Sequence, residues 1–395
     1  MAQLHNGNCQ ISYKFRLYPS GHQEQKLLEV LDRCRFVYNK MLEGLNKQDK
    51  PNRLELQNSI PKLKEEFPEL KEVYSKVLQY ESYKLFSNLR ALAHLKKNGK
   101  KVGRLRFKGK DWFKTMTYNQ NGFKIIETGK RCQTLHLSKI GDIRIRIHRE
   151  TGGKIKQITV KRYPSEKWFA FICCEAENVM KNHNNKKIGI DLGTINFVYD
   201  SENNHINHPR FLNESLEKLR QEQRILSRKK KGSVNRQKQK IKIAKLYEKV
   251  CNQRDDFLHK LSRKYVDGYG FIAIEKLDIK GLVEKSHNPR NMLDASWSRF
   301  LQFLAYKAVR AGCQVVKVEP RGTTQKCSQC GNIVPKKLWN RIHKCSCGLV
   351  IDRDLNSARN ILQSGLERAY PLETEPLPTG QVQSMNQEAP FERWE

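Results

Sequence analysis

The sequence lacks several features that would assign it to common functional classes. No apolar run approaches the roughly 18 residues that a membrane-spanning helix needs. The first residues, Met1–Asn8, lack the apolar core of a secretory signal peptide. No Walker-type phosphate-binding loop and no Ser-His-Asp order stand out along the chain. These absences argue against a membrane protein, a secreted protein, a P-loop NTPase and a serine hydrolase, and we expect a cytoplasmic protein.

Acidic residues are scarce relative to basic ones. The 395 residues include 75 Lys and Arg but only 41 Asp and Glu, which gives a formal net charge of +34. An excess of this size indicates a polyanionic partner, either nucleic acid or an anionic membrane surface. Nucleic acid is the stronger interpretation because no long apolar segment is present. The length and the hydrophobic content of 38% predict two or three domains with a substantial core.

Cysteine occurs in an odd number, 11, which argues against a complete disulfide framework. Seven cysteines are scattered, and several lie inside apolar strings. This distribution favours buried free thiols in a reducing compartment. The seven are Cys9, Cys34, Cys132, Cys173, Cys174, Cys251 and Cys313.

The other four cysteines have the spacing of a small zinc site. Cys327 and Cys330 form a Cys-x-x-Cys pair, and Cys345 and Cys347 form a Cys-x-Cys pair further along. Tetrahedral zinc is bound by two such close pairs, and four protein ligands leave no open position, so we predict a structural ion. The second pair is short, which makes His343 an alternative to Cys347 as the fourth ligand.

Acidic residues stand at the ends of predicted core elements in three places. Asp191 and Glu275 each end an apolar strand, and Asp352 and Asp354 come just before a predicted helix. Ordinary structural explanations exist for Asp191, as a turn residue, and for Asp352 or Asp354, as a helix cap. A buried carboxylate without a partner is costly, however, so three such places together favour a metal-binding cluster.

The motifs around these residues resemble those of the TnpB family, transposon-encoded RNA-guided DNA nucleases related to type V CRISPR effectors. The matching stretches are Gly189-Ile-Asp-Leu-Gly-Thr194, Ile272-Ala-Ile-Glu-Lys-Leu277, and Cys-x-x-Cys with Asp352-Arg-Asp-Leu-Asn-Ser-Ala358. Their order resembles a RuvC-type nuclease domain interrupted by a zinc finger. The resemblance is strong over the second half of the chain and weaker over the first.

The resemblance implies a catalytic role for Asp191, Glu275 and Asp354. In the family's Asp-Arg-Asp motif the second acid is catalytic, which selects Asp354 over Asp352. The three carboxylates would bind two Mg²⁺ ions, one activating water and the other stabilising the leaving oxygen. Asp352 is then expected to cap the helix or support the site, and Asn356 to orient a ligand.

The periodicity of the chain predicts an α+β protein of several domains. A strand over residues 11–18, a helical block at 20–97 and renewed strands near 103 fit a β-barrel with a helical insertion. Later, strands are followed by alternating helices and strands, the RNase H-like order. In the terms of the resemblance, we expect a wedge-like β-barrel at 1–19 and 98–182, a helical recognition lobe at 20–97, a RuvC-like nuclease domain at 183–321 and 351–370, an inserted zinc finger at 322–350, and a disordered tail at 371–395.

Two basic segments are candidates for nucleic-acid contacts. One is rich in aromatics, and the other is the tip of a predicted helical hairpin over 212–266. Charged helices are usually solvated, but a one-signed excess between two candidate catalytic strands favours contacts with RNA or with a guide–target duplex. The aromatic residues Phe107, Trp112 and Phe113 either stack on unpaired bases or belong to the barrel core. The basic candidates are Arg104, Arg106, Lys108 and Lys110 in the first segment, and Arg228, Lys229, Lys230, Lys231 and Arg236 in the second.

The resemblance implies an RNA-guided DNA endonuclease. A guide RNA from the transposon end would bind the protein, which would recognise a short motif beside the target DNA and cut at a RuvC-type site. Two alternatives are a nuclease-inactive RNA-guided regulator, against which the intact acids argue, and a transposon accessory protein that does not cut. The sequence predicts neither the adjacent motif nor the oligomeric state.

Overall fold

The computed structural model describes residues 4–5, 8–127, 132–177, 184–286, 289–337 and 339–370. The predicted disordered tail at 371–395 lies outside these ranges. The chain divides into two compact units, one of residues 1–181, 210–263 and 302–311 and the other of 182–209, 264–301 and 312–395. This two-way division does not test the five-part domain assignment, which stays a prediction.

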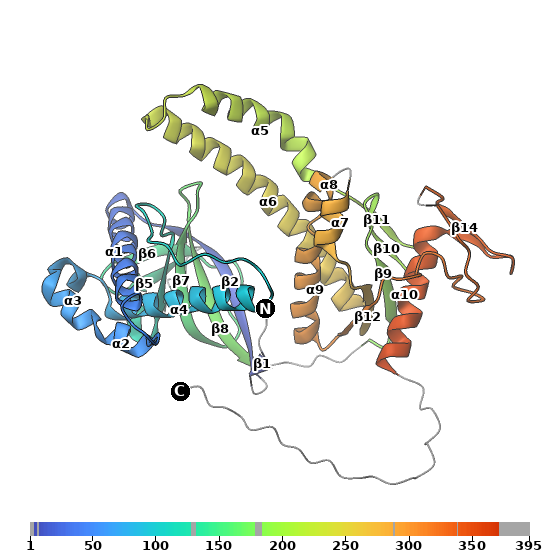
Figure 1. The fold of residues 1–395 in the computed structure, drawn as a ribbon, viewed down its shortest axis with the longest axis horizontal. Coiled ribbons are helices and arrows are strands. Elements are labelled where there is room, and N and C mark those ends of the chain that lie inside the picture. The colour runs from blue at the N-terminus through green and yellow to red at the C-terminus, as the bar shows by residue number, and fades with distance from the viewer. Residues whose placement is uncertain are drawn as a thin grey trace, which may run out of the picture. The chain divides into compact units, whose positions relative to one another are not determined.

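The first unit contains an antiparallel sheet that curves into a nearly closed barrel (Figure 1). The strand order is β3-β7-β8-β2-β6-β5-β4, and β1 pairs with β2. The long strand β2 pairs with β8 along its length and with β6 near its end, so it joins both halves of the sheet. The strands are β1 (Leu4–His5), β2 (Asn8–Tyr18), β3 (Thr115–Asn119), β4 (Phe123–Ile126), β5 (Gln133–Leu137), β6 (Gly141–Arg146), β7 (Lys154–Arg162) and β8 (Trp168–Glu177).

Helices are inserted between β2 and β3, as the sequence predicted. They are α1 (Gly21–Leu45), α2 (Arg53–Asn58), α3 (Ile60–Glu66) and α4 (Ser75–Lys97), with a 3₁₀ turn at Pro68–Glu72. The start of α1 is set by a capping box, in which Ser20 and Gln23 each accept a hydrogen bond from the other's backbone amide. The buried face of α1 shares one apolar core with the inner face of the barrel.

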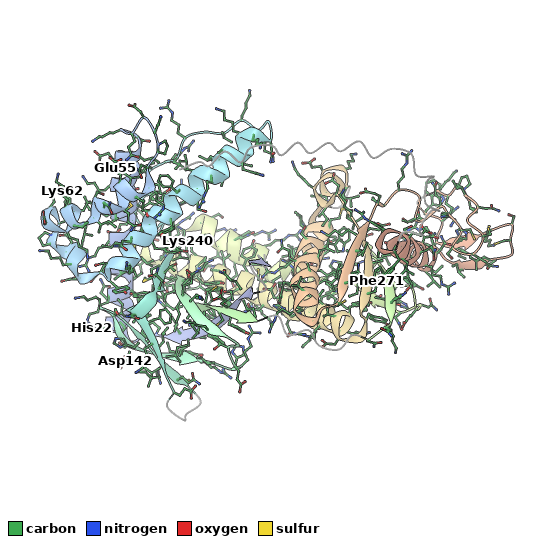
Figure 2. All side chains as sticks on the ribbon, turned by 90° about the horizontal axis from the view of Figure 1, so that it is seen from below. His22, Glu55, Lys62, Asp142, Lys240 and Phe271 are labelled. Atoms are coloured by element: carbon green, nitrogen blue, oxygen red, sulfur yellow. The ribbon has the colours of Figure 1, made fainter. Side chains whose placement is uncertain are left out.

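A helical hairpin of α5 (Phe211–Arg228) and α6 (Val234–Gly268) follows later in the chain. Within the first unit, Lys167 Nζ pairs with Glu248 Oε1 of α6 at 3.0 Å. Helix α9 (Trp297–Ala311) contributes Lys307, which donates to the His259 carbonyl oxygen at 2.6 Å and to Ser262 Oγ at 2.7 Å. Lys240, labelled in Figure 2, is one of the exposed basic residues of α6.

The second unit is built on a five-stranded mixed sheet in the order β11-β10-β9-β12-β13. The strands are β9 (Lys187–Asp191), β10 (Asn196–Asp200), β11 (His205–Asn207), β12 (Phe271–Glu275) and β13 (Gln314–Val318). Strands β9, β12 and β13 run parallel, while β10 is antiparallel to both of its neighbours. Phe271, labelled in Figure 2, begins β12. Two short helices, α7 (Ile279–Lys285) and α8 (Pro289–Ala295), follow β12.

Helix α10 (Arg353–Ala369) packs very closely on this sheet. A side chain at Gly189 of β9 would collide with the Ala358 carbonyl group, and one at Gly365 would collide with the Cβ atom of Ala273. Glycine at these two positions lets the helix backbone approach the strands. The close packing fixes α10 relative to β9 and β12.

A small two-stranded hairpin precedes α10. Its strands are β14 (Ile342–Lys344) and β15 (Val350–Asp352), and they pair antiparallel. Across the part of the chain that the structure describes, no helix has both the length and the hydrophobicity to cross a membrane.

Candidate metal centres

Asp191 and Glu275 come to the same edge of the second unit's sheet. Ile190 and Ile274, the residues immediately before them, are paired in parallel register on β9 and β12. The carboxyl ends of adjacent parallel strands therefore bring these two acids next to each other, the place where open α/β sheets usually build sites. Asp354 lies in the first turn of α10, which packs on the same strands.

Burial makes ionisation of Asp191 and Glu275 unfavourable at this edge. Burial, which is the largest cause, and the charges of Glu275 and Asp354 together raise the pKa of Asp191 to about 8, against the opposing effects of Ser357 and Arg353. Burial also raises the pKa of Glu275, and a hydrogen bond from Thr323 opposes that rise. A bound divalent cation would favour the charged forms of these carboxyl groups, although the oxygen atoms of Asp191, Glu275 and Asp354 do not all lie within 4.8 Å of one another in the structure.

The carboxyl group of Asp354 is engaged by two arginines. Its Oδ1 accepts from Nε and Nη2 of Arg353 at 3.2 and 3.1 Å, and its Oδ2 accepts from Nη1 of Arg341 at 3.4 Å. Asp352 caps the helix, as expected, because its Oδ1 accepts from the Asp354 amide at 2.7 Å. Asp354 would have to exchange guanidinium contacts to bind a cation together with Asp191 and Glu275.

A hydrogen-bonded network links Glu275 to α10. Thr323 Oγ1 donates to Glu275 Oε1 at 2.6 Å, and Asn360 Nδ2 of α10 donates to the Thr323 carbonyl oxygen at 2.8 Å. Sequence reasoning did not identify Thr323 or Asn360 as part of the site. The available signal was the spacing of Asn356 and Asn360, which lie four residues apart on one face of a helix.

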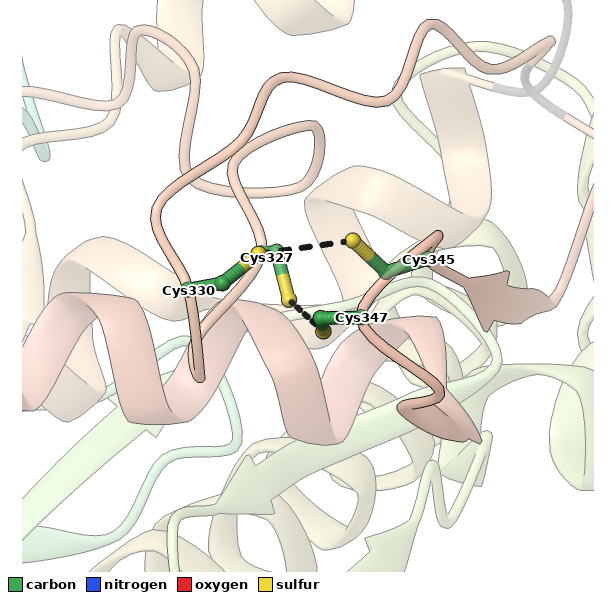
Figure 3. Close-up of side chains that lie close together, drawn as sticks. All are labelled: Cys327, Cys330, Cys345 and Cys347. Carbon is green, nitrogen blue, oxygen red and sulfur yellow. Dashed lines mark hydrogen bonds between the residues drawn. The ribbon is translucent and has the colours of Figure 1, made fainter.

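The four cysteine side chains point toward one another (Figure 3). All four sulfur atoms lie within 4.8 Å of one another, with Cys327–Cys347 at 3.7 Å and Cys330–Cys345 at 3.5 Å. A zinc tetrahedron with bonds of about 2.3 Å has edges of about 3.8 Å, so this set fits zinc. Over the described ranges, no other group of three or more His, Cys, Asp or Glu ligand atoms is gathered in this way.

The backbone around the cysteines favours thiolates. Hydrogen bonds from the backbone amide of Cys347, the largest cause, and with the other three cysteines lower the pKa of the Cys345 thiol to about 6, against the effect of burial. A backbone hydrogen bond at Asn332 also lowers the pKa of the Cys330 thiol, but burial and the other three cysteines raise it to about 12 overall. Gly331 and Gly348 follow the two cysteine pairs with φ angles of 81° and 92°, which allow the tight turns that the sequence predicted there. Both features are typical of zinc knuckles, in which the ligands are deprotonated sulfur atoms.

His343 lies outside the group of four ligand atoms. Its ring is fully buried, and its Nδ1 faces the ammonium group of Lys336 in a close contact. The geometry therefore places Cys347, rather than His343, in the position of the fourth ligand.

The basic candidates have different surroundings. Arg236 Nη1 donates to the carbonyl oxygens of Leu226 at 2.7 Å and Lys229 at 2.8 Å. These two bonds stabilise the turn between α5 and α6, a role that the sequence did not predict. Lys229 is half-buried, and its Nζ donates to the Asn235 carbonyl oxygen. Lys108 is also half-buried, whereas the remaining candidates are exposed: Arg104, Arg106, Lys110, Arg228, Lys230 and Lys231.

Comparison with known proteins identifies several relatives. A family model described as "Probable transposase" matches residues 171–286, and one described as "Cas12f1-like, TNB domain" matches residues 297–361. A protein of Streptomyces pristinaespiralis whose name describes an RNA-guided DNA endonuclease is 31% identical over 373 residues, covering 90% of this chain and 89% of that protein. InsQ of Escherichia coli K12, with the same kind of name, is 29% identical and covers 92% of this chain and 97% of that protein.

A solved structure shares the fold. The chain resembles a protein in the cryo-EM structure of a Cas12f1-sgRNA-target DNA complex, with a TM-score of 0.61 and 14% sequence identity. The match covers 90% of this chain and 99% of the other.

A third family model, described as "Helix-turn-helix domain", matches residues 8–50. In the structure these residues form strand β2 and the single helix α1, and the next helix begins only at Arg53. The match is therefore to a strand followed by one long helix in this chain.

Proposed function

The chain belongs to the TnpB family, and we propose that it is a DNA endonuclease directed by a guide RNA. Two of its relatives have names that describe RNA-guided DNA endonucleases. The proposal is carried by one observation. Asp191, Glu275 and Asp354 come from three separate elements to one edge of the second unit's sheet, where the pKa of Asp191 is raised to about 8. In order of sequence the five strands are arranged 3-2-1-4-5, which supports an RNase H-like, RuvC-type nuclease domain.

The donor set fits magnesium, which prefers carboxylate and water oxygens. Asp191, Glu275 and Asp354 would hold two Mg²⁺ ions, which when bound activate the attacking water and stabilise the leaving oxygen. Thr323 orients Glu275 through its hydroxyl group. Asp352 fixes the first turn of α10, which carries Asp354.

The other predicted partners follow from the same proposal. Cys327, Cys330, Cys345 and Cys347 would bind one structural zinc ion beside α10. The exposed basic residues of the loop before β3 and of the hairpin tip would contact nucleic-acid backbones. A guide RNA from the transposon end would supply sequence recognition, and the protein would read a short motif in duplex DNA next to the target.

The test is cleavage by the purified complex. The protein is co-expressed with RNA from the end of its own element, and the complex is incubated with Mg²⁺ and plasmids that carry the target beside a randomised flank. Asp191→Ala and Glu275→Ala should each reduce cleavage by more than the roughly 10–100-fold that is typical of outer-shell partners, and should leave RNA and target binding intact. Glu319→Ala is the matched control, because this exposed carboxylate follows the neighbouring strand β13 and pairs with Lys276.

Each other outcome has a defined meaning. Undiminished cleavage by Glu275→Ala would refute the assignment of the carboxylates. Target binding without cleavage by the wild-type protein would identify a regulator instead. A preparation that contains no RNA and does not cut would indicate an accessory protein.

A further inference from the structure

The loop of residues 99–114, between α4 and β3, presents two aromatic side chains to solvent. Phe107 is 59% exposed and Trp112 is 65% exposed. Leu105 and Phe113 of the same loop pack against the core of the first unit. The structure thus separates two interpretations that the sequence left open: Phe113 belongs to the core, whereas Phe107 and Trp112 do not.

Helix α1 fixes the backbone of this loop at Lys108. The Asn39 side chain accepts from the Lys108 amide at 2.8 Å and donates to the Lys108 carbonyl oxygen at 2.9 Å. Beyond it, the Trp112 amide donates to the Gly109 carbonyl oxygen at 3.2 Å and closes a tight turn. Trp112 therefore projects from a loop whose backbone is already held in place. A partner that stacks on its ring costs little conformational entropy of the loop.

The surroundings of Trp112 are strongly basic. Residues 99–114 contain seven Lys and Arg and a single acid, Asp111. The Lys108 ammonium group lies 5.3 Å from the centre of the Trp112 ring, and Arg106 and Lys110 are exposed. An aromatic ring with cations around it complements a nucleotide, because the base stacks on the ring while the phosphates meet the cations. A lipid surface would instead call for an apolar helix face, and this loop offers two rings on a turn.

We propose that Trp112 is a stacking platform for an unpaired nucleotide, with Phe107 as a second aromatic contact and Arg106, Lys108 and Lys110 at the phosphates. The inference rests on the proposed function only in requiring that the chain binds nucleic acid. Stacking does not involve the three carboxylates. All proteins in the test therefore carry Asp191→Ala, so that cleavage does not affect the binding measurement.

The experiment compares three probes: a 15-nucleotide oligouridine, a 15-nucleotide oligothymidine, and a 15-base-pair DNA duplex. Trp112→Ala should weaken binding of an unpaired probe about tenfold, because base stacking on an aromatic side chain has roughly this effect, and should leave duplex affinity unchanged. Trp112→Phe should restore most of the affinity. Tyr83→Ala is the matched control, since Tyr83 is 46% exposed and has the Arg53 guanidinium 4.1 Å above its ring.

Tryptophan fluorescence gives a second readout. Stacking of a base on Trp112 should quench part of the emission of the five tryptophans. Trp112→Phe should still bind the unpaired probes but should not show this quenching.

The probe that loses affinity for Trp112→Ala identifies the ligand. A loss of affinity confined to oligouridine assigns the platform to RNA, and one confined to oligothymidine assigns it to single-stranded DNA. Affinity of Trp112→Ala within twofold of the parent for both unpaired probes, or an equal loss for the duplex, would overturn the proposal. Failure of guided cleavage in the protein with Asp191 intact would refute the proposed function but would not affect the proposal that Trp112 stacks on an unpaired base.

Discussion

The amide group of Asn356 in α10 holds the backbone on both sides of Cys327. Its Oδ1 accepts from the Ser328 amide at 2.9 Å, and its Nδ2 donates to the Lys326 carbonyl oxygen at 2.8 Å. The Asn356 side chain is fully buried, whereas Ser328 is half-buried and Lys326 is exposed. Asn360 Nδ2 of the same helix donates to the same Lys326 carbonyl oxygen at 2.6 Å, so two side chains of α10 hold the backbone beside the first cysteine of the zinc centre.

We predict that Asn356→Ala weakens the link between the segment around Cys327 and helix α10. Removing the amide takes the partner of the Ser328 amide away, which costs about 1–3 kcal/mol, whereas the Lys326 carbonyl oxygen keeps its hydrogen bond from Asn360 Nδ2 at 2.6 Å. Cleavage should fall roughly 10–100-fold, as for other residues that orient metal ligands. Zinc should remain at one ion per chain, because the four thiols are untouched. The measurements are metal content, cleavage rate, and hydrogen exchange of residues 323–330 and 353–360.

The control is Gln363→Ala, which removes an amide from the exposed face of the same helix. It should leave exchange and cleavage as they are. An Asn356→Ala protein that exchanges and cuts like the wild type would show that Asn356 does not couple the segment around Cys327 to the helix.

A second prediction concerns the fourth zinc ligand. Cys347→Ser and Cys330→Ser should each lose the zinc ion and lower cleavage, although no cysteine contacts the scissile phosphate. His343→Ala should retain zinc, because the His343 ring lies outside the group of sulfur atoms and contacts Lys336. Elemental analysis of the purified variants decides between them. Zinc retained by Cys347→Ser but lost by His343→Ala would reverse the assignment.

Local patterns were sufficient for most of the fold. Alternation over 11–18 predicted β2, periodicity predicted the helical block at 20–97 that contains α1 and α4, and apolar strands were predicted at β9 and β12. The ends of these elements were also marked locally, by Ser20 before α1 and by the acids Asp191 and Glu275. Because these patterns predict where a strand ends, the sequence could predict that Asp191 and Glu275 lie at the ends of β9 and β12.

Contacts between residues that are far apart along the chain could not be predicted from the sequence. Nothing near Thr323 indicates that its hydroxyl would bind Glu275, 48 positions earlier, because only the folded path of the chain brings them together. The role of Arg236 was hidden for a related reason. Among many basic residues in one hairpin, charge alone cannot distinguish the one that binds backbone carbonyl groups.

A third prediction concerns the buried carboxyl group of Glu81 in α4. Glu81 is fully buried, and burial raises its pKa from 4.5 to about 7, although Lys84 donates to it at 2.7 Å. A raised pKa means that the folded state holds the proton more tightly than the unfolded state. Its contribution to stability is therefore complete below about pH 4.5 and is lost as the pH rises to about 7, by up to roughly 3 kcal/mol.

Glu81→Gln should remove this pH dependence, because a neutral amide has no proton to lose. Urea midpoints at pH 5, 6, 7 and 8 measure the effect, and hydrogen exchange of α4 locates it. Glu55→Gln, an exposed position on α2 that is labelled in Figure 2, should change nothing. If Glu81→Gln lost stability between pH 5 and 7 as steeply as the wild type, Glu81 would not be the titrating group.

The last prediction concerns the turn between α5 and α6. Lys230 and Lys231 are exposed there, whereas Lys229 is half-buried and binds the Asn235 carbonyl oxygen. If the turn contacts phosphates, each contact contributes about −0.7 to −0.9 to the slope of log affinity against log salt. Replacing all three lysines by alanine should then reduce the steepness of the slope by about 2, mostly through Lys230 and Lys231.

The control must remove the same charge elsewhere. Lys47, Lys62 and Lys71 are exposed on or next to the inserted helices, so their triple replacement by alanine lowers the net charge equally. Titrations of the duplex probe at four salt concentrations should show a flattened slope for the turn variant and an unchanged slope for the control. Arg236 stays in place, because it holds the turn together. An equal change in both variants would mean that the lysines act through overall charge, and an unchanged slope in the turn variant would mean that the turn faces solvent when nucleic acid is bound.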